Sequence, residues 1–165
     1  MKTSTFKFIA TLFLVTGFLS FTSCSNDDDG IKETDTTVTQ DQLPEKAKEF
    51  ISEFFYDYEI KSIQKKTIDS VVLYEVEFTN DYDIIFNSLG DWTEMEAPTG
   101  MTLPSGAIPE PVRATLDAQY PGYGVNEINT TGQGYYVQLV NDQGENGLGL
   151  YFNESGEITD ITNAD

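Results

Sequence analysis

The chain has 165 residues, with 9 lysines and arginines against 28 aspartates and glutamates, and a formal net charge of −19. It has one cysteine and no histidine, which excludes an internal disulfide, the usual zinc, copper and haem ligand sets, and the common Ser-His and Cys-His nucleophile pairs. A surface this acidic repels phosphate backbones, so the sequence predicts no nucleic-acid partner.

Residues 1–23 have the form of a targeting segment. Lys2 and Lys7 supply a positive start, and an apolar run over residues 8–21 follows. The segment ends in the letters FTSC, the last of which is Cys24. Small residues before a lone cysteine resemble the lipobox of a bacterial lipoprotein, in which that cysteine is lipidated. An ordinary secretory signal cut near the same place is the alternative, and the run is short for a membrane span of about 20 residues.

Residues 24–40 are polar, begin CSNDDDG, and lack aromatic residues and apolar periodicity. Such a composition cannot bury enough surface to offset chain entropy, so the sequence predicts a disordered acidic tether here. The acidic run behind Cys24 resembles the export signal of surface lipoproteins of the Bacteroidetes, which implies the outer membrane or the cell surface, with the periplasmic face as the alternative. Loss of Lys2 and Lys7 with the leader leaves seven basic and 28 acidic residues, a formal charge of −21. Anionic lipids would repel this surface, so membrane attachment must come from acyl chains on Cys24.

The folded part begins near Asp41. Pro44 suits a first helical turn, where Glu45 favours the positive end of the helix dipole. Apolar residues then recur at helical spacing: Ala47, Phe50, Ile51, Phe54, Phe55 and Tyr58. The period next changes from helical to alternating, which predicts strands over residues 60–67, 71–79, 82–87 and 92–95.

The same order returns in the second half of the chain. The letters LPE at residues 43–45 return as IPE at 108–110, and FNSLGDWT at 86–93 returns as FNESGEIT at 152–159. A unit of about 55 residues buries too little surface to be comfortably stable alone. We therefore expect an α+β fold of two tandem repeats, each one helix followed by about four antiparallel strands, merged into one sheet with the helices on one face. The predicted repeats span residues 41–101 and 102–165, and the second repeat places strands at 125–130, 135–140, 148–152 and 158–161.

This order of motifs is similar to that of the PepSY-like family, which is also described as similar to the β-lactamase inhibitor protein. The motifs are Leu-Pro or Ile-Pro at a helix start, Tyr-x-Val-x-aromatic or aliphatic, and Phe-Asn-x-x-Gly-Asp/Glu before a last strand, and they cover residues 41–163. The resemblance implies a small exported binding module of the cell envelope, with suggested roles in restraining peptidases or other enzymes. It supplies no catalytic residue and no inhibitory contact to carry over.

Strand alternation predicts a set of apolar, aromatic and polar side chains on the face turned away from the helices: Leu73, Glu75, Ile85, Tyr136, Gln138, Val140 and Tyr151. Tyrosine suits protein recognition because it buries a rigid ring while its hydroxyl stays hydrogen-bonded. The sequence therefore predicts a protein-binding patch, rimmed by acids such as Glu77 and Asp83. The alternative is that these side chains pack under the tether or under the linker at residues 97–107.

Acidic turns are the other candidate site. Asp81 with Asp83, and Asn141 with Asp142 and Glu145, lack the spacing of a calcium-binding EF-hand loop, so we expect no metal and no cofactor. The predicted function is a lipid-anchored, non-enzymatic binding module for a protein or peptide, acting as a regulator or inhibitor of an exported enzyme or peptidase. A structural or assembly accessory of an envelope complex is the first alternative, and a hydrolase with paired carboxylates is the second.

Overall fold

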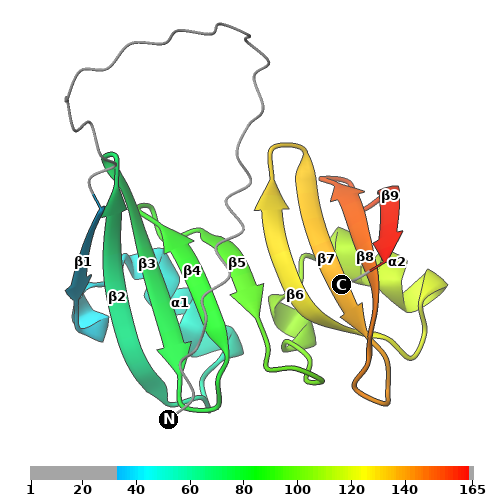
Figure 1. Ribbon diagram of the computed structural model, residues 1–165, viewed down its shortest axis with the longest axis horizontal. Coiled ribbons are helices and arrows are strands. Elements are labelled where there is room, and N and C mark those ends of the chain that lie inside the picture. Colours follow the sequence, from blue (N-terminus) through cyan, green and yellow to red (C-terminus); the bar gives the residue numbers. More distant parts are fainter. Residues whose placement is uncertain (1–32, 164–165) are drawn as a thin grey trace, which may run out of the picture. The chain divides into compact units, whose positions relative to one another are not determined.

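The computed structural model describes residues 33–163 (Figure 1), which belong to one compact unit, Ile31–Asp165. The predicted leader over residues 1–23 and the predicted lipidation site at Cys24 lie outside the described residues. Over residues 33–163, no helix has the length and apolar character needed to cross a bilayer.

Across residues 33–163 the fold is α+β, as predicted, with nine strands in a single antiparallel sheet that follows chain order from β1 to β9. The strands are β1 (Glu33–Thr37), β2 (Ile60–Ile68), β3 (Val71–Phe78), β4 (Asp83–Asn87), β5 (Trp92–Glu96), β6 (Gly124–Thr131), β7 (Gly134–Val140), β8 (Asn146–Asn153) and β9 (Ile158–Asn163). The helices are α1 (Glu45–Phe54) and α2 (Glu110–Gln119), with one-turn 3₁₀ helices at Gln40–Gln42 and Ser105–Ala107. Each α-helix thus precedes four strands, and in Figure 1 both helices lie behind the sheet.

The edge strand β1 differs from the sequence prediction, which made residues 24–40 a disordered tether. Residues 33–37 instead pair antiparallel with β2, from Glu33 opposite Ile68 to Thr37 opposite Gln64. Backbone hydrogen bonds along the edge of β2 suffice for this pairing, and the Gln64 amide adds a hydrogen bond to the Thr37 hydroxyl at 3.1 Å. All five side chains of β1 are exposed, so the strand carries no apolar alternation from which it could be predicted.

Helix α1 begins at Glu45, later than the 3₁₀ turn at Gln40–Gln42 that precedes it. The interruption is caused by Pro44, because a proline disfavours helical dihedrals in the residue before it. Leu43 is accordingly extended, with φ −68° and ψ 150°. The sequence pattern placed Pro44 in the first helical turn, whereas in the structure Pro44 is the N-cap and the helix begins one residue later.

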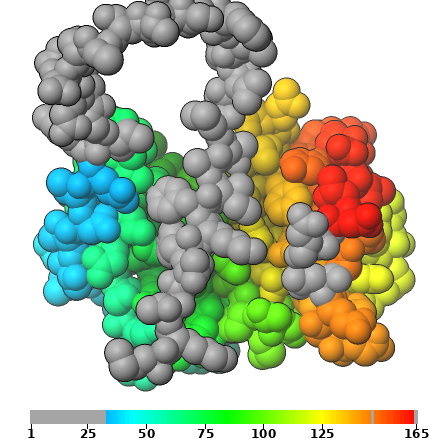
Figure 2. Space-filling model, in the orientation of Figure 1, coloured from blue at the N-terminus to red at the C-terminus, as the bar shows by residue number. Residues whose placement is uncertain are grey.

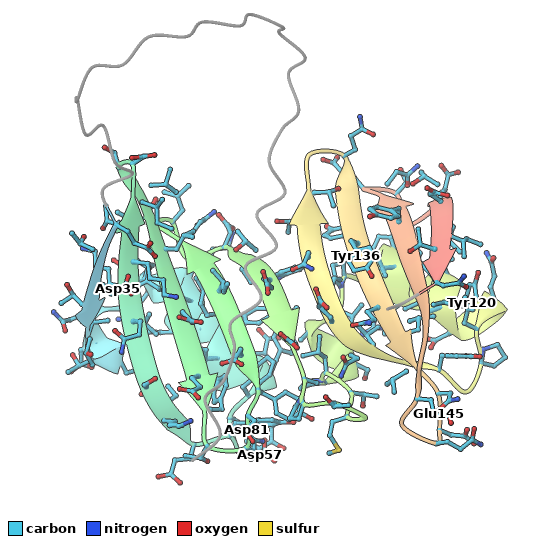
Figure 3. The ribbon with its side chains drawn as sticks, in the orientation of Figure 1. Asp35, Asp57, Asp81, Tyr120, Tyr136 and Glu145 are labelled. Carbon is cyan, nitrogen blue, oxygen red and sulfur yellow. The ribbon has the colours of Figure 1, made fainter. Side chains whose placement is uncertain are left out.

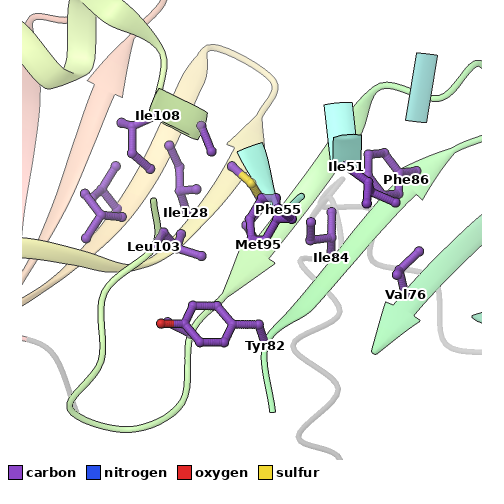
Figure 4. Close-up of a cluster of buried hydrophobic side chains, with 14 of the residues drawn as sticks. Ile51, Phe55, Val76, Tyr82, Ile84, Phe86, Met95, Leu103, Ile108 and Ile128 are labelled. Atoms are coloured by element: carbon purple, nitrogen blue, oxygen red, sulfur yellow. The ribbon is translucent and has the colours of Figure 1, made fainter. Parts of the chain in front are cut away.

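The core lies on one face of the sheet (Figure 4). The Phe50 ring of α1 and the ring of Phe55, directly after the helix, reach the strands. Ring centroids are 6.0 Å apart for Phe50 and Phe86 and 5.4 Å apart for Phe55 and Phe78. On this face, the largest fully buried side chains come from six strands: Val76, Phe78, Ile84, Phe86, Met95, Ile128, Val137, Leu139 and Leu150. Complete burial of one such side chain contributes about 1.5–3 kcal/mol, so this face holds the fold together.

Strands β5 and β6 join the two halves of the sheet through three register pairs. In the middle pair Met95 faces Ile128, and both side chains are fully buried. Trp92 of β5 stacks on Tyr135 of β7, with ring centroids 6.1 Å apart. The core is therefore continuous across the junction.

Asn126 fixes the linker that precedes α2. The register of β6 shifts between Val125 and Glu127, so Asn126 has no cross-strand partner. Its side chain is buried, and its Nδ2 donates to the carbonyl oxygens of Ala97, Pro98 and Met101 at 3.1, 3.1 and 2.9 Å. One side-chain amide therefore serves three carbonyl groups of the linker. The linker is also tied to β6 by its backbone, since the Ala97 N–H donates to the Asn126 carbonyl oxygen at 2.8 Å.

Two hairpin loops with the pattern Asn-x-x-Gly-Asp/Glu lie against the helix starts. In the loop after β8, Asn153 Oδ1 accepts from the backbone N–H groups of Ser155 and Glu157, both at 3.0 Å. Gly156 has a φ of +77°, and a β-carbon there would lie 2.3 Å from the Pro111 carbonyl oxygen in the first turn of α2. At Gly90, in the equivalent loop after β4, a β-carbon would lie 2.8 Å from the Ala47 nitrogen of α1. Each loop thus requires glycine for two reasons: the loop lies close to the helix backbone, and the residue has a positive φ.

Candidate functional site

The side chains that the sequence assigns to a binding patch lie on the face opposite the buried core, which we call the open face. Figures 1 and 2 view the sheet from this side. Glu75 stands directly opposite Ile85, and Tyr136 directly opposite Tyr151. The remaining predicted residues alternate with buried core residues in the same way: Leu73 on β3, and Gln138 and Val140 on β7. Val140 is itself buried, so it is not available for contact.

Four carboxylates form a continuous row across four strands of the open face, near the end of the sheet where β3 turns into β4. Glu77 of β3 pairs in register with Asp83 of β4, Asp83 with Glu96 of β5, and Glu96 with Glu127 of β6. Residues directly opposite each other on neighbouring strands have β-carbons about 4.5–5.5 Å apart, and like charges in such pairs are destabilising. We call these four residues the acidic row.

The adjacent row of the open face changes from acidic to aromatic along the sheet. It runs from Glu75 through Ile85 to Glu94, and then through Asn129 to the tyrosine pair. The rings of Tyr136 and Tyr151 have centroids 5.1 Å apart, and Figure 3 labels Tyr136 on β7. The predicted patch is therefore divided, with Leu73, Glu75 and Ile85 on one half of the sheet and the tyrosines on the other.

Glu94, Glu96 and Glu127 belong to the open face and are missing from the set predicted from sequence. The signal for the first two is present in the letters WTEME, residues 92–96, where acids alternate with the core residue Met95. Alternation of this kind places Glu94 and Glu96 on the face opposite Met95. The acidic row itself depends on cross-strand register, which no single strand reveals.

Carboxylates of the open face are held in an environment that favours the neutral form. Burial, with repulsion from Glu77 and other acids, raises the pKa of Asp83 to about 7. Burial and repulsion from Glu127 and other acids raise the pKa of Glu94 to about 7, and the same two causes raise the pKa of Glu96. Burial and nearby like charges both disfavour ionisation.

Two lysines of β2 partly offset this charge. Lys66 forms an ion pair with Glu75 at 2.8 Å, and Lys61 pairs with Glu77 at the end of the acidic row. Both pairs lie at the β2–β3 side, so Asp83, Glu96 and Glu127 have no ion pair among the residues that the structure describes. The negative potential of the open face is therefore greatest over β4 to β6.

No group of three or more carboxylate or cysteine side chains in the described part of the chain is arranged to hold a metal ion. The acidic row has one carboxylate on each of four neighbouring strands, so the four side chains lie side by side on the open face and do not converge on one point. Such an arrangement suits a partner that brings several positive groups of its own. Asn141 and Glu145, which were weighed above as possible calcium ligands, instead complete a hairpin loop, in which Asn141 Nδ2 donates to the Glu145 carboxylate at 3.1 Å.

We expect Glu94→Gln to flatten the dependence of stability on pH. A carboxyl whose pKa is raised in the folded state stabilises the fold below its unfolded pKa, and this contribution is lost as pH rises through the folded pKa of about 7. Wild-type protein should therefore lose more stability between pH 5 and pH 8 than Glu94→Gln, as measured by urea midpoints. Glu53→Gln on the exposed side of α1 is the control, and a wild-type dependence in Glu94→Gln would contradict the assignment.

Comparison with known proteins gives a family and several related structures. The family model described as "Putative beta-lactamase-inhibitor-like, PepSY-like" matches residues 26–73 and 72–160. A comparison with curated proteins finds no match. A "putative calcium-regulated periplasmic protein" from Bacteroides thetaiotaomicron is 26% identical, with a TM-score of 0.69 over 78% of this chain and 97% of its own. A "putative periplasmic protein" of the DUF2874 family from Bacteroides vulgatus gives the same four values. A further periplasmic protein from Bacteroides vulgatus, described as of unknown function, is 23% identical, with a TM-score of 0.67 over 80% of this chain and 100% of its own.

Proposed function

The chain belongs to the PepSY-like, β-lactamase-inhibitor-like family, and from this membership we propose that it is a non-enzymatic binding module of the cell envelope that captures a protein partner on its open face. Its structural relatives are described as periplasmic proteins, and the family description refers to an inhibitor rather than to an enzyme. The proposed role is regulation or inhibition of an exported enzyme or peptidase.

The acidic row is the observation that carries this proposal. Four directly opposed carboxylates weaken the sheet. Burial, followed by repulsion from neighbouring acids, raises the pKa of both Asp83 and Glu96. A basic partner surface would remove the repulsion and be attracted from a distance. The Tyr136–Tyr151 pair beside the row supplies rigid rings of the kind that often dominate binding energy at protein interfaces. The partner we propose is thus a protein or peptide with clustered lysines or arginines.

Attachment to the membrane through a lipid on Cys24 is part of the proposal, with the outer membrane or cell surface as its place. It is supported by the lone cysteine after an apolar leader and by the description of the relatives as periplasmic. We expect wild-type protein to sediment with membranes and Cys24→Ser to move to the soluble fraction. Equal sedimentation of both proteins, or a mature N-terminus other than Cys24 by mass spectrometry, would refute this anchor.

We also propose that the two halves arose from a tandem duplication. The support is the order of elements, α1 before β2 to β5 and α2 before β6 to β9. The equivalent loops at Gly90 and Gly156 lie against the first turn of α1 and α2 respectively. On this basis the open face is a single platform built from two related units.

Affinity capture from envelope extract, with the chain from Ile31 onward as bait, tests the function. We expect Glu96→Gln with Glu127→Gln to weaken capture at least tenfold while stability stays equal or rises, because a repulsive pair has been removed. Tyr136→Ala with Tyr151→Ala should abolish capture with little change in thermal unfolding. Capture by wild-type protein should also weaken as salt concentration increases.

Glu49→Gln with Glu53→Gln, on the exposed side of α1, is the matched control for charge removal and should capture normally. Capture that survives both open-face variants would exclude this face as the binding site. Collapse of the fold in the tyrosine variant would show that the rings are structural. A large complex on intact cells, detected by crosslinking without any added ligand, would instead favour an assembly accessory.

A further inference from the structure

A hollow of about 340 Å³ lies on the core side of the sheet, away from the open face. Three of its side chains form a cross-strand row, because Thr36 of β1 stands opposite Lys65 of β2, and Lys65 opposite Tyr74 of β3. Thr67 lies two residues along β2, and the 3₁₀ turn at Gln40–Gln42 contributes Gln42. The volume is at the lower end of the range for small-molecule sites, about 300–1,000 Å³.

Lys65 differs from the other lysines that the structure describes. The remaining four, Lys46, Lys48, Lys61 and Lys66, each form an ion pair with a carboxylate. Lys65 has no carboxylate within ion-pair distance among residues 33–163, and its Nζ lies 6.0 Å from the centre of the Tyr74 ring. The chain has 28 acidic residues, so a half-buried lysine without a carboxylate partner is unusual here.

The hollow contains hydrogen-bond donors but no carboxylate. Its full lining is Thr36, Val38, Gln42, Lys65, Thr67 and Tyr74. Gln42 already uses its Oε1 to accept from the backbone and hydroxyl of Thr39, at 2.9 and 3.2 Å, which leaves its Nε2 as a donor. The two threonine hydroxyls, the tyrosine hydroxyl and the lysine ammonium can all donate as well. Val38 and Tyr74 also pack against the core and supply an apolar side.

We propose that this hollow binds a small organic anion, whose carboxylate or phosphate oxygens meet Lys65 and whose apolar part lies against Val38 and Tyr74. Charge-assisted hydrogen bonds from an ammonium to such oxygens are stronger than neutral ones. The negative charge of the whole molecule opposes anion binding, so selectivity for this one place must come from the local donors. The site is separate from the open face, and the proposal stands whether or not that face captures a protein.

Titration of the full chain with acetate, benzoate and inorganic phosphate, followed by amide NMR at matched ionic strength, tests this proposal. We expect saturable shifts at residues 36, 42, 65 and 67 that sodium chloride does not produce. Benzoate should bind more tightly than acetate if the ligand is a carboxylate, and phosphate most tightly if it is a phosphate. Lys65→Met should weaken binding at least tenfold. Lys61→Met, on the same strand but paired with Glu77, should bind normally.

Shifts that do not saturate with any of the three anions, or that are the same in Lys65→Met as in Lys61→Met, would overturn the proposal. Thr67→Val provides a second variant if Lys65→Met fails to fold, since it removes one donor and keeps the volume of the side chain. It should weaken binding severalfold, and unchanged affinity in that variant would equally exclude the site.

Discussion

Replacement of Asn126 by aspartate is expected to destabilise the fold by about 3–5 kcal/mol. The wild-type amide donates to the carbonyl oxygens of Ala97, Pro98 and Met101 from a buried position. A carboxylate of the same shape has no hydrogen to donate. One of its oxygens would therefore face the three carbonyl oxygens, and its negative charge would be buried. The free energy of unfolding by urea is the measurement.

The exposed residue Asn80 provides the control for this substitution. Asn80→Asp lies in the turn between β3 and β4 and should change stability by no more than about 0.5 kcal/mol. Asn126→Ala should fall between the two, because it leaves the three carbonyl groups without a donor but adds no charge. A loss in Asn126→Asp no greater than in Asn80→Asp would mean that the linker does not depend on this side chain.

Gly156→Ala is expected to destabilise the fold by about 2–4 kcal/mol. The residue has a φ of +77°, and the added β-carbon would lie 2.3 Å from the carbonyl oxygen of Pro111 and 2.4 Å from its carbonyl carbon. Both are backbone atoms, so no side chain can rotate to relieve the contact. Either the loop after β8 or the first turn of α2 must move, which should appear as a lower thermal midpoint.

Gly122→Ala separates the effect of φ from the effect of contact. Gly122 has a φ of +91°, and a β-carbon there would meet nothing within 4 Å. Its cost should be limited to the unfavourable dihedral, about 1–2 kcal/mol. Equal losses at Gly122 and Gly156 would show that the hairpin does not press on the helix as the structure indicates.

Most of the regular elements could be predicted because they alternate or repeat with a clear period. The strands of both halves follow the predicted segments to within about two residues, as at β3 (Val71–Phe78) and β7 (Gly134–Val140). The exception is β1, whose residues are all exposed and polar. Its pairing depends on the free edge of β2, a feature of the assembled sheet that its own sequence does not carry.

The open face was predictable only in part, for a related reason. Alternation identifies which side chains share a face, so Glu75, Tyr136 and Tyr151 could be placed together from sequence. The acidic row required the register of β3 to β6, and register is set by turns and bulges between strands. The hollow around Lys65 required β1 as well, so a prediction that left residues 33–37 disordered could not find it.

Under the proposed lipid anchor on Cys24, the position of β1 also limits how far the domain can stand from a bilayer. Only eight residues, 25–32, separate Cys24 from Glu33, and a fully extended chain of that length spans at most about 28 Å. A free segment reaching residue 40 would have allowed about twice that reach. With a lipid on Cys24, the platform would operate within a shallow layer next to the membrane, where it could meet only those basic proteins that come close to the lipid surface themselves.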